Sequence, residues 1–294
     1  VKYDIIDTLD SKLNYKGNLQ VYYLNGNDKK IIERKYYNIV SEPSVKDNAD
    51  ASKGGGEIKI SFTEEGREYL ATLNGINSII ISFETVINTS AVLGEAIPNN
   101  ATLDYTNSFG TNTKYDVPEN NIPEVHTGGV LLEKVDASDN NVKLQGAKFK
   151  IYPTLEDAKN GTNAIVNPAN KTQEWEVTTD EDGRAIFAGL SYGNIGNGAN
   201  EGSTTYYIVE TVAPTYTVTG NNGEVIKKQY NLLKKPLEVT VNATSHLESN
   251  KIVVANSKFT LPVTGGVGTV IFTLGGLAIM GVAAFLYMRT TRRV

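Results

Sequence analysis

Apolar residues recur at every second position in many short segments of this chain, and clusters of Asn, Gly, Asp and Ser separate the segments. This two-residue period is typical of β-strands that bury one face. It is clearest in residues 19–23, 58–62, 78–87 and 101–105. Because turn signals are regularly spaced and long helical periods are rare, the pattern predicts an all-β fold of Ig-like β-sandwiches.

Helical patterns are confined to three places. Residues 63–70 and 155–160 predict two short helices, and Thr63 is a suitable N-cap for the first. Every residue of 267–288 is apolar, Gly or Thr. At about 1.5 Å rise per residue, these roughly 22 positions span a hydrocarbon core of about 30 Å. The pattern therefore predicts a C-terminal transmembrane helix.

A polar stretch interrupts the strand pattern between residues 108 and 129, where Pro118, Pro123 and a Gly pair favour a linker. We expect a first β-sandwich at 1–115, a linker at 116–127 and a second β-sandwich at 128–258. Residues 261–294 form the C-terminal segment. Because no apolar leader precedes the first strand pattern, we interpret the first domain as N-terminally truncated.

Composition excludes several kinds of site. The net charge of −5 gives no basic surface for nucleic acid. With no Cys and only two His, the chain has no material for disulfides or a Cys/His zinc site. We expect no metal and no cofactor. Apart from residues that react with one another, no nucleophile–base set is evident, so we do not expect an enzyme.

Three polar residues stand where strand alternation places an inward-facing apolar residue. Each shares its face with Val, Leu, Ile or Tyr two and four positions earlier. They are Lys134, Glu210 and Asn256. Burying any one of them alone costs several kcal/mol, so a fold that buries all three is expected to bring them together.

Together these groups can react. Desolvation favours the neutral amine of Lys134, which can attack the carboxamide carbon of Asn256. Glu210 can polarise the carbonyl and pass protons to the departing ammonia. The resulting isopeptide bond would close a loop of about 120 residues, worth about 4–5 kcal/mol in chain entropy. Alternation alone supports a non-reactive interpretation equally well. In it, Lys134 extends to solvent, Glu210 pairs with Lys134, and Asn256 caps a turn.

The pentapeptide before the apolar run has the form Leu-Pro-x-Thr-Gly and consists of Leu261, Pro262, Val263, Thr264 and Gly265. Three arginines follow the run: Arg289, Arg292 and Arg293. This order resembles the LPxTG cell-wall sorting signal of Gram-positive bacteria. The resemblance implies transient membrane insertion, followed by cleavage between Thr264 and Gly265 by a housekeeping or pilin-specific sortase. The protein would then be secreted and joined to peptidoglycan or a pilus. The alternative is an ordinary tail anchor.

Residues 129–256 resemble a Cna-B-type domain of Gram-positive pilins. The similarity lies in residues 132–136, in 144–149 and in an E-box at 206–214, which reads Tyr-x-Ile-x-Glu-Thr-x-Ala-Pro. In that family the residues that match Lys134, Glu210 and Asn256 form an autocatalytic isopeptide bond, with the glutamate as catalyst. The resemblance therefore favours the reactive interpretation.

Residues 3–9 and 100–107 resemble the fimbrial domain of backbone pilins. By that resemblance Asp7 catalyses a second Lys–Asn bond. Alternation places Asn107 on the face of residues 101, 103 and 105, so we prefer it to Asn100 as the reacting amide. Lys2 is too close to Asp7 in sequence, and the lysine is expected upstream of Val1.

These resemblances predict a pilus shaft subunit that a sortase joins to neighbouring pilin subunits. Such pilins carry a lysine in a Tyr-Pro-Lys motif, but residues 151–154 read Ile-Tyr-Pro-Thr. We expect that lysine upstream as well. The alternative is a monomeric wall-anchored adhesin, similar to matrix-binding surface proteins, which uses these domains as a stalk and binds a host extracellular-matrix protein.

Overall fold

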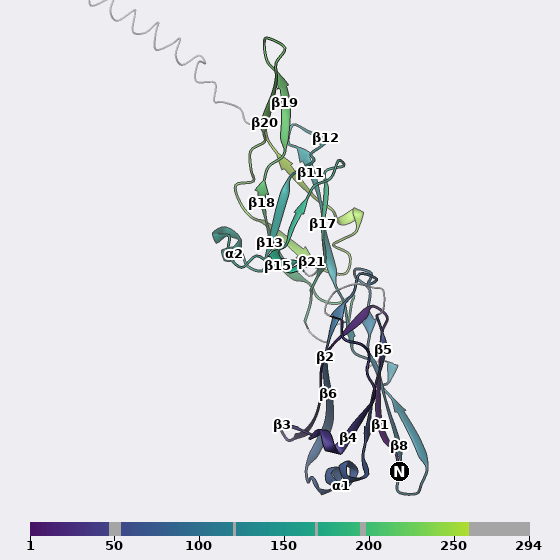
Figure 1. The fold of residues 1–294 in the computed structure, drawn as a ribbon. Helices are drawn as coiled ribbons and strands as arrows, with labels where there is room; N and C mark the ends of the chain where they lie inside the picture. Colours follow the sequence, from purple (N-terminus) through teal and green to yellow (C-terminus); the bar gives the residue numbers. More distant parts are fainter. Residues whose placement is uncertain (47–53, 120–121, 168–169, 195–197, 259–294) are drawn as a thin grey trace, which may run out of the picture. The chain divides into compact units, whose positions relative to one another are not determined.

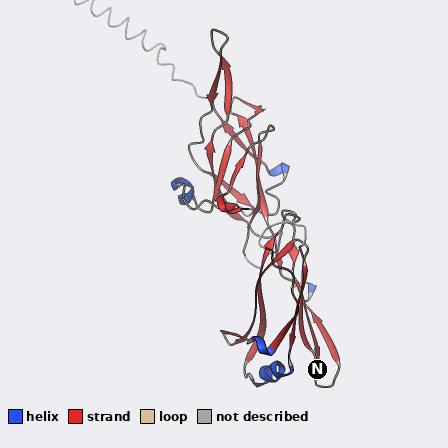
Figure 2. Ribbon diagram, in the orientation of Figure 1, coloured by secondary structure: helices blue, strands red, loops and turns tan. Residues whose placement is uncertain are grey.

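Antiparallel pairing dominates the structure, a computed structural model that describes residues 1–46, 54–119, 122–167, 170–194 and 198–258. Chain contacts separate one unit, Val1–Ser257, from a second, Lys258–Val294. The first unit contains two sets of facing sheets with separate apolar cores (Figures 1 and 2). The all-β sandwich fold predicted from alternation is confirmed.

The first sandwich packs a five-stranded sheet against a three-stranded sheet. The larger sheet has the order β4-β5-β1-β8-β9. Its strands are β1 (Tyr3–Leu9), β4 (Tyr37–Ser41), β5 (Gly56–Phe62), β8 (Asn100–Thr106) and β9 (Asn112–Asp116). The smaller sheet has the order β3-β2-β6, with β2 (Leu13–Asn25), β3 (Asp28–Ile31) and β6 (Ile76–Ile87). Side chains such as Val21, Ile58 and Ile60 are completely buried between the two sheets.

The second sandwich also has two sheets. One contains β12 (Asp139–Lys143), β11 (Gly128–Asp136) and β17 (Arg184–Leu190), and β22 (Ile252–Asn256) pairs with β11. The other has the order β16-β13-β18-β21, with β13 (Lys148–Tyr152), β16 (Glu176–Thr178), β18 (Thr204–Val212) and β21 (Leu237–Val241). Leu132, Phe149, Phe187 and Ile208 fill the space between them.

Short pairings complete the described strands. They are β7 (Ile97–Pro98) with β10 (Glu124–Val125), β14 (Val166–Asn167) with β15 (Asn170–Glu174), and β19 (Thr215–Thr219) with β20 (Val225–Gln229). Among the described residues, Arg34–Tyr36 and Glu248–Asn250 form 3₁₀ turns. In the described part of the expected linker at 116–127, β9 ends at Asp116, and β10 pairs back onto β7.

The two short helices form where capping signals predicted them. In α1 (Glu64–Thr72), the Thr63 hydroxyl accepts a hydrogen bond from the Gly66 amide at 3.0 Å. In α2 (Leu155–Asn160), Thr154 caps in the same way. These side chains satisfy amides that the first helical turn leaves unpaired.

No helix in the part of the chain that the structure describes is long and apolar enough to cross a membrane. The expected transmembrane helix at 267–288 and the pentapeptide at 261–265 lie outside the described residues.

Candidate functional site

Lys134 lies in the interior of the second sandwich. Strand β11 has β17 and β22 as neighbours, and the inward-facing residues before Lys134 on this strand, Val130 and Leu132, belong to the core. The side chain of Lys134 is completely buried. The reading in which Lys134 extends to solvent is therefore wrong.

The other two members of the predicted group approach from two different strands. Asn256 ends β22, which runs parallel to β11 and places Asn256 opposite Asp136. Glu210 lies on β18, in the facing sheet, and its burial follows the alternation of Tyr206 and Ile208. The group thus lies on the first strand of this sandwich, on its last strand and on the facing sheet.

All three side chains are within hydrogen-bond distance of one another. The Lys134 Nζ donates to Asn256 Oδ1 at 2.5 Å and lies 3.2 Å from Glu210 Oε1. The same Glu210 oxygen accepts a hydrogen bond from Asn256 Nδ2 at 2.8 Å. Asn256 therefore contacts the amine and the acid instead of capping a turn. One carboxyl oxygen of Glu210 contacts both the amine and the amide nitrogen.

Burial controls the electrostatics of this group. Removal of the Lys134 ammonium from water lowers its pKa, and the nearby Glu210 carboxylate opposes that shift. The Phe149 ring centroid lies 5.8 Å from Nζ and closes the apolar side. Transfer of one proton from Nζ to Glu210 converts the ion pair into a neutral amine and acid without changing the net charge. The lowered pKa means that Lys134 gives up this proton more readily than a lysine in water does.

The first sandwich holds a different amide from those expected. Asp7 is buried on the inner face of β1, and Asn99 Nδ2 donates to its Oδ2 at 2.8 Å. Among the described residues, Oδ1 of Asp7 and Oδ1 of Asn99 are both buried without a hydrogen-bond partner. Asn99 borders a 210 Å³ cavity that also contacts Leu9 and Leu13.

Neither Asn107 nor Asn100 approaches Asp7 in this way. Asn107 caps the turn after β8, where its side-chain oxygen accepts from the amides of Phe109 and Thr111. Asn100 is exposed and pairs across the sheet with Thr8. Asn107 lies beyond the end of β8, and the β1–β8 register sets Asp7 opposite Ala101, six residues from Asn107.

Sequence reasoning missed Asn99 because it stands one residue before β8, outside the alternating run. The only clue to Asn99 was its place in the chain. It comes directly before β8, the strand in which Ala101 pairs with Asp7 of β1. Backbone contacts to Glu210 gave no sequence signal. The Leu233 amide donates to Glu210 Oε2 at 2.9 Å from an irregular segment.

Asp7 should make the first sandwich sensitive to pH. Burial raises its pKa, and the Asn99 hydrogen bond only partly offsets this. A carboxyl with a raised folded pKa binds more protons folded than unfolded, so stability falls as pH rises from its unfolded pKa through its folded pKa. We expect Asp7→Asn to stabilise the chain at pH 7, at about 1.4 kcal/mol per displaced pKa unit.

Urea unfolding at neutral and acidic pH measures this effect. The advantage of Asp7→Asn should shrink below the unfolded pKa of aspartate, near pH 4, where both states of the wild type are protonated. Asp28→Asn, on the exposed strand β3, is the matched control and should change little. An advantage that persists unchanged at acidic pH would contradict this assignment.

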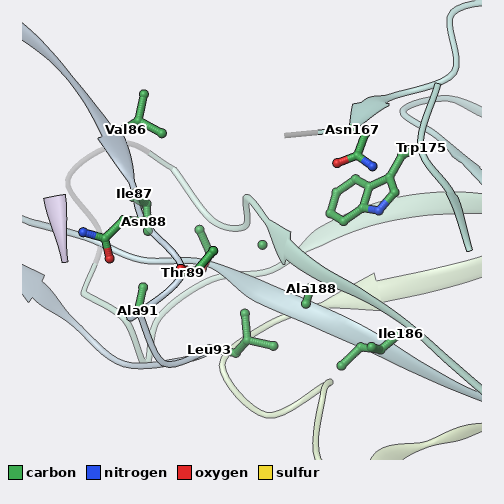
Figure 3. A pocket seen from close by; sticks show the side chains of 12 residues that line it. Val86, Ile87, Asn88, Thr89, Ala91, Leu93, Asn167, Trp175, Ile186 and Ala188 are labelled. Carbon is green, nitrogen blue, oxygen red and sulfur yellow. The ribbon is translucent and has the colours of Figure 1, made fainter. Parts of the chain in front are cut away.

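A separate 590 Å³ cavity offers no comparable chemistry (Figure 3). Apolar side chains dominate its lining, with Ile87, Leu93, Trp175 and Ile186 among them. None of the described residues that line it is charged. Its described lining therefore offers no general acid or base.

Two family models match parts of this chain. Residues 128–258 match the SpaA family, described as a prealbumin-like fold domain. Residues 253–292 match the LPXTG cell wall anchor motif. A search of curated proteins finds no match. The anchor motif marks the protein as a surface protein that is attached covalently to the cell wall.

Solved structures of Gram-positive major pilins share the fold. A C-terminal fragment of a Streptococcus agalactiae major pilin is 24% identical, with 87% of each chain covered and a TM-score of 0.62. The Bacillus cereus major pilin subunit is 23% identical, with 88% of this chain and 60% of that chain covered and a TM-score of 0.54. Domains D2 and D3 of a Corynebacterium diphtheriae major pilin are 16% identical, with 88% and 86% covered and a TM-score of 0.55.

Proposed function

We propose that this chain is a shaft subunit of a sortase-assembled pilus, with a mechanical role. The anchor motif supplies the Thr–Gly bond that a sortase cuts, and the resemblance to major pilins supports attachment of Thr264 to a neighbouring subunit. In the assembled fibre each subunit then carries the tension on all subunits beyond it. Such a role requires a chain that does not extend when pulled from its ends.

The buried group meets this requirement by forming a covalent bond. Glu210 takes one proton from the Lys134 ammonium, and the neutral amine attacks the carboxamide carbon of Asn256. Glu210 then delivers that proton to the Asn256 nitrogen, which leaves as ammonia, and takes the remaining extra proton from Nζ. One C–N bond forms and one breaks, with no oxidant or cofactor. Glu210 suits this transfer because its Oε1 is 3.2 Å from the amine and 2.8 Å from the leaving nitrogen.

One observation carries the mechanical proposal: Lys134 and Asn256 lie on the first and last strands of the second sandwich. Tension applied at Thr264 enters this sandwich through β22 and leaves it through β11. A bond between these two strands removes the 121 residues between positions 134 and 256 from the loaded path. Hydrogen bonds of the sheets are then spared, because the covalent bond carries the force.

The same proposal extends to Asp7 and Asn99 as the acid and the amide of a second site. Asp7 is buried and Asn99 is its hydrogen-bond donor, as in the acid–amide contact of Glu210 and Asn256. The described residues bring no lysine to Asp7, and Lys2 instead binds Asp104 at 2.5 Å. The amine of this site is assigned to a lysine beyond the described residues.

Wall extracts test the polymer directly. We expect a ladder of high-mass species from wild-type cells, resistant to boiling in detergent because the subunits are joined covalently. Thr264→Ala should abolish the ladder and release the monomer from the wall. Thr260→Ala, just before the signal, is the matched control and should leave the ladder intact. A single wall-anchored band at monomer mass in wild-type cells would refute the shaft role and favour a monomeric adhesin stalk.

A further inference from the structure

Residues 229–233 run from the last residue of β20 toward β21. They contact the ends of all three strands that carry the reacting side chains. This 229–233 segment contributes no atom that reacts. Its contacts nevertheless control where the reacting atoms lie.

Three of these contacts are with the chain that follows β18, the strand of Glu210, and β22, the strand of Asn256. Tyr230 N donates to the Pro214 carbonyl at 3.0 Å, and Gln229 Nε2 donates to the Ala213 carbonyl at 3.1 Å. Both carbonyls follow β18, the strand of Glu210. Asn231 N donates to the Ser257 carbonyl at 2.9 Å, directly after Asn256. The segment thus ties the end of β18 to the end of β22.

A buried hydrogen bond attaches the segment to the third strand. The Tyr230 hydroxyl donates to Asp136 Oδ2 at 2.7 Å, and Asp136 lies two residues after Lys134 on β11. Asp136 is 1% exposed and Tyr230 is 5% exposed. Burial and the Asp136 carboxylate both raise the pKa of Tyr230, so the phenol remains a donor at neutral pH.

The far end of the segment orients the catalytic carboxyl. The Leu233 amide donates to Glu210 Oε2 at 2.9 Å, which turns the other oxygen, Oε1, toward Lys134 and Asn256. Loss of the Tyr230 contact would free the segment at its buried end. The Leu233 amide and the three strand ends would then be held less precisely.

We propose that Tyr230 and Asp136 are positioning residues for the Lys134–Asn256 bond, acting by holding the 229–233 segment across the three strand ends. This inference rests on the proposed bond. Attack requires the amine and the carboxamide carbon to be held about 3–3.5 Å apart, and a displacement of about 1 Å can cost about 100-fold in rate. Tyr230 and Asp136 supply this precision without touching the reacting atoms.

The test follows ammonia loss by mass in the full chain as it folds after cell-free synthesis without sortase, with samples quenched over time. Tyr230→Phe should react about tenfold or more slowly than wild type, because the reacting atoms are less well aligned. The matched control is Tyr192→Phe, which removes an equally buried hydroxyl, bonded to the Ala199 carbonyl, from a part of the domain without these contacts. It should react at the wild-type rate.

A second measurement separates positioning from general loss of structure. In an Asn256→Ala background, which keeps Glu210 but cannot react, hydrogen exchange of the Leu233 amide should be faster with Tyr230→Phe than without it. Exchange in β13 should be unchanged. If Tyr230→Phe does not fold, Asp136→Asn replaces it, because this variant keeps the side-chain shape and one acceptor oxygen; it should also react more slowly than wild type.

The outcomes are distinct. If wild type loses ammonia and Tyr230→Phe reacts at the same rate, or if Tyr192→Phe slows the reaction equally, the positioning role is overturned while the bond stands. If wild type never loses ammonia, both the bond and the positioning role fail.

Discussion

Replacing Glu210 with glutamine should leave the chain at its full sequence mass, whereas the wild-type chain should weigh less by one ammonia. Glutamine keeps the shape of the side chain but cannot take up the proton of Lys134. General acid–base groups typically contribute about 100- to 10,000-fold to a rate, so the variant should remain unreacted for as long as wild type needs to react completely. Intact-mass spectrometry of the purified chain measures the difference.

Peptide mapping should place the bond. A tryptic digest of wild type should contain one branched peptide that includes Lys134 and Asn256, and this peptide should be missing from Glu210→Gln. Glu174→Gln, at an exposed glutamate of the same domain that pairs with Lys150, is the control and should react like wild type. A wild-type chain at full mass, or a Glu210→Gln chain that still loses ammonia, would refute the assignment.

The second large effect is on stability. Asn256→Ala prevents the bond but retains the Lys134–Glu210 ion pair, so it should lose about 4–5 kcal/mol of unfolding free energy from the opened loop. Lys134→Ala prevents the same bond and also leaves Glu210 buried without its cation. Removing one member of a buried pair costs about 3–5 kcal/mol. Lys134→Ala should therefore be clearly less stable than Asn256→Ala.

Urea unfolding followed by tryptophan fluorescence compares the three chains. Trp175 is the only tryptophan and is packed in the core of the second sandwich, against Phe187, so its emission reports on this domain. Lys150→Ala is the control, because Lys150 is partly exposed and forms a surface ion pair. It should lose less than about 1 kcal/mol of unfolding free energy. Equal stability of wild type and Asn256→Ala would show that no bond closes the loop.

The stability comparison and the mass measurement depend on different physical properties. Mass reports only whether ammonia has left, while unfolding reports what the closed loop and the buried charges contribute. If Glu210→Gln is unreacted but Lys134→Ala is no less stable than Asn256→Ala, the catalytic role of Glu210 would hold. The buried ion pair would then contribute little to stability.

Most of the second sandwich could be predicted from its sequence. Alternation is a local property, and by itself it predicts inward faces for Lys134, Glu210 and Asn256. All three are buried in the fold. Capping chemistry is equally local, which is why Thr63 marked the start of α1.

The first sandwich shows the limit of that reasoning. A two-residue period identifies the face of a strand, but it contains no information on how far one strand is shifted along another. Asn107 satisfied the period, yet the antiparallel register places it beyond Tyr105, the partner of Tyr3 at the opposite end of β1 from Asp7. At about 3.4 Å per residue, the six positions between Ala101 and Asn107 separate it from Asp7 by about 20 Å.

By itself, the sequence determined the β-sandwich class, the inward-facing polar residues of the second sandwich and the sorting signal, because each of these is encoded in neighbouring residues. Only the tertiary structure decided which groups meet. The pairing of Asp7 with Asn99, the sharing of one Glu210 oxygen by Lys134 and Asn256, and the contact of Tyr230 with Asp136 all join residues more than 40 positions apart. Strand register and sheet packing set these distances, and no local pattern contains them.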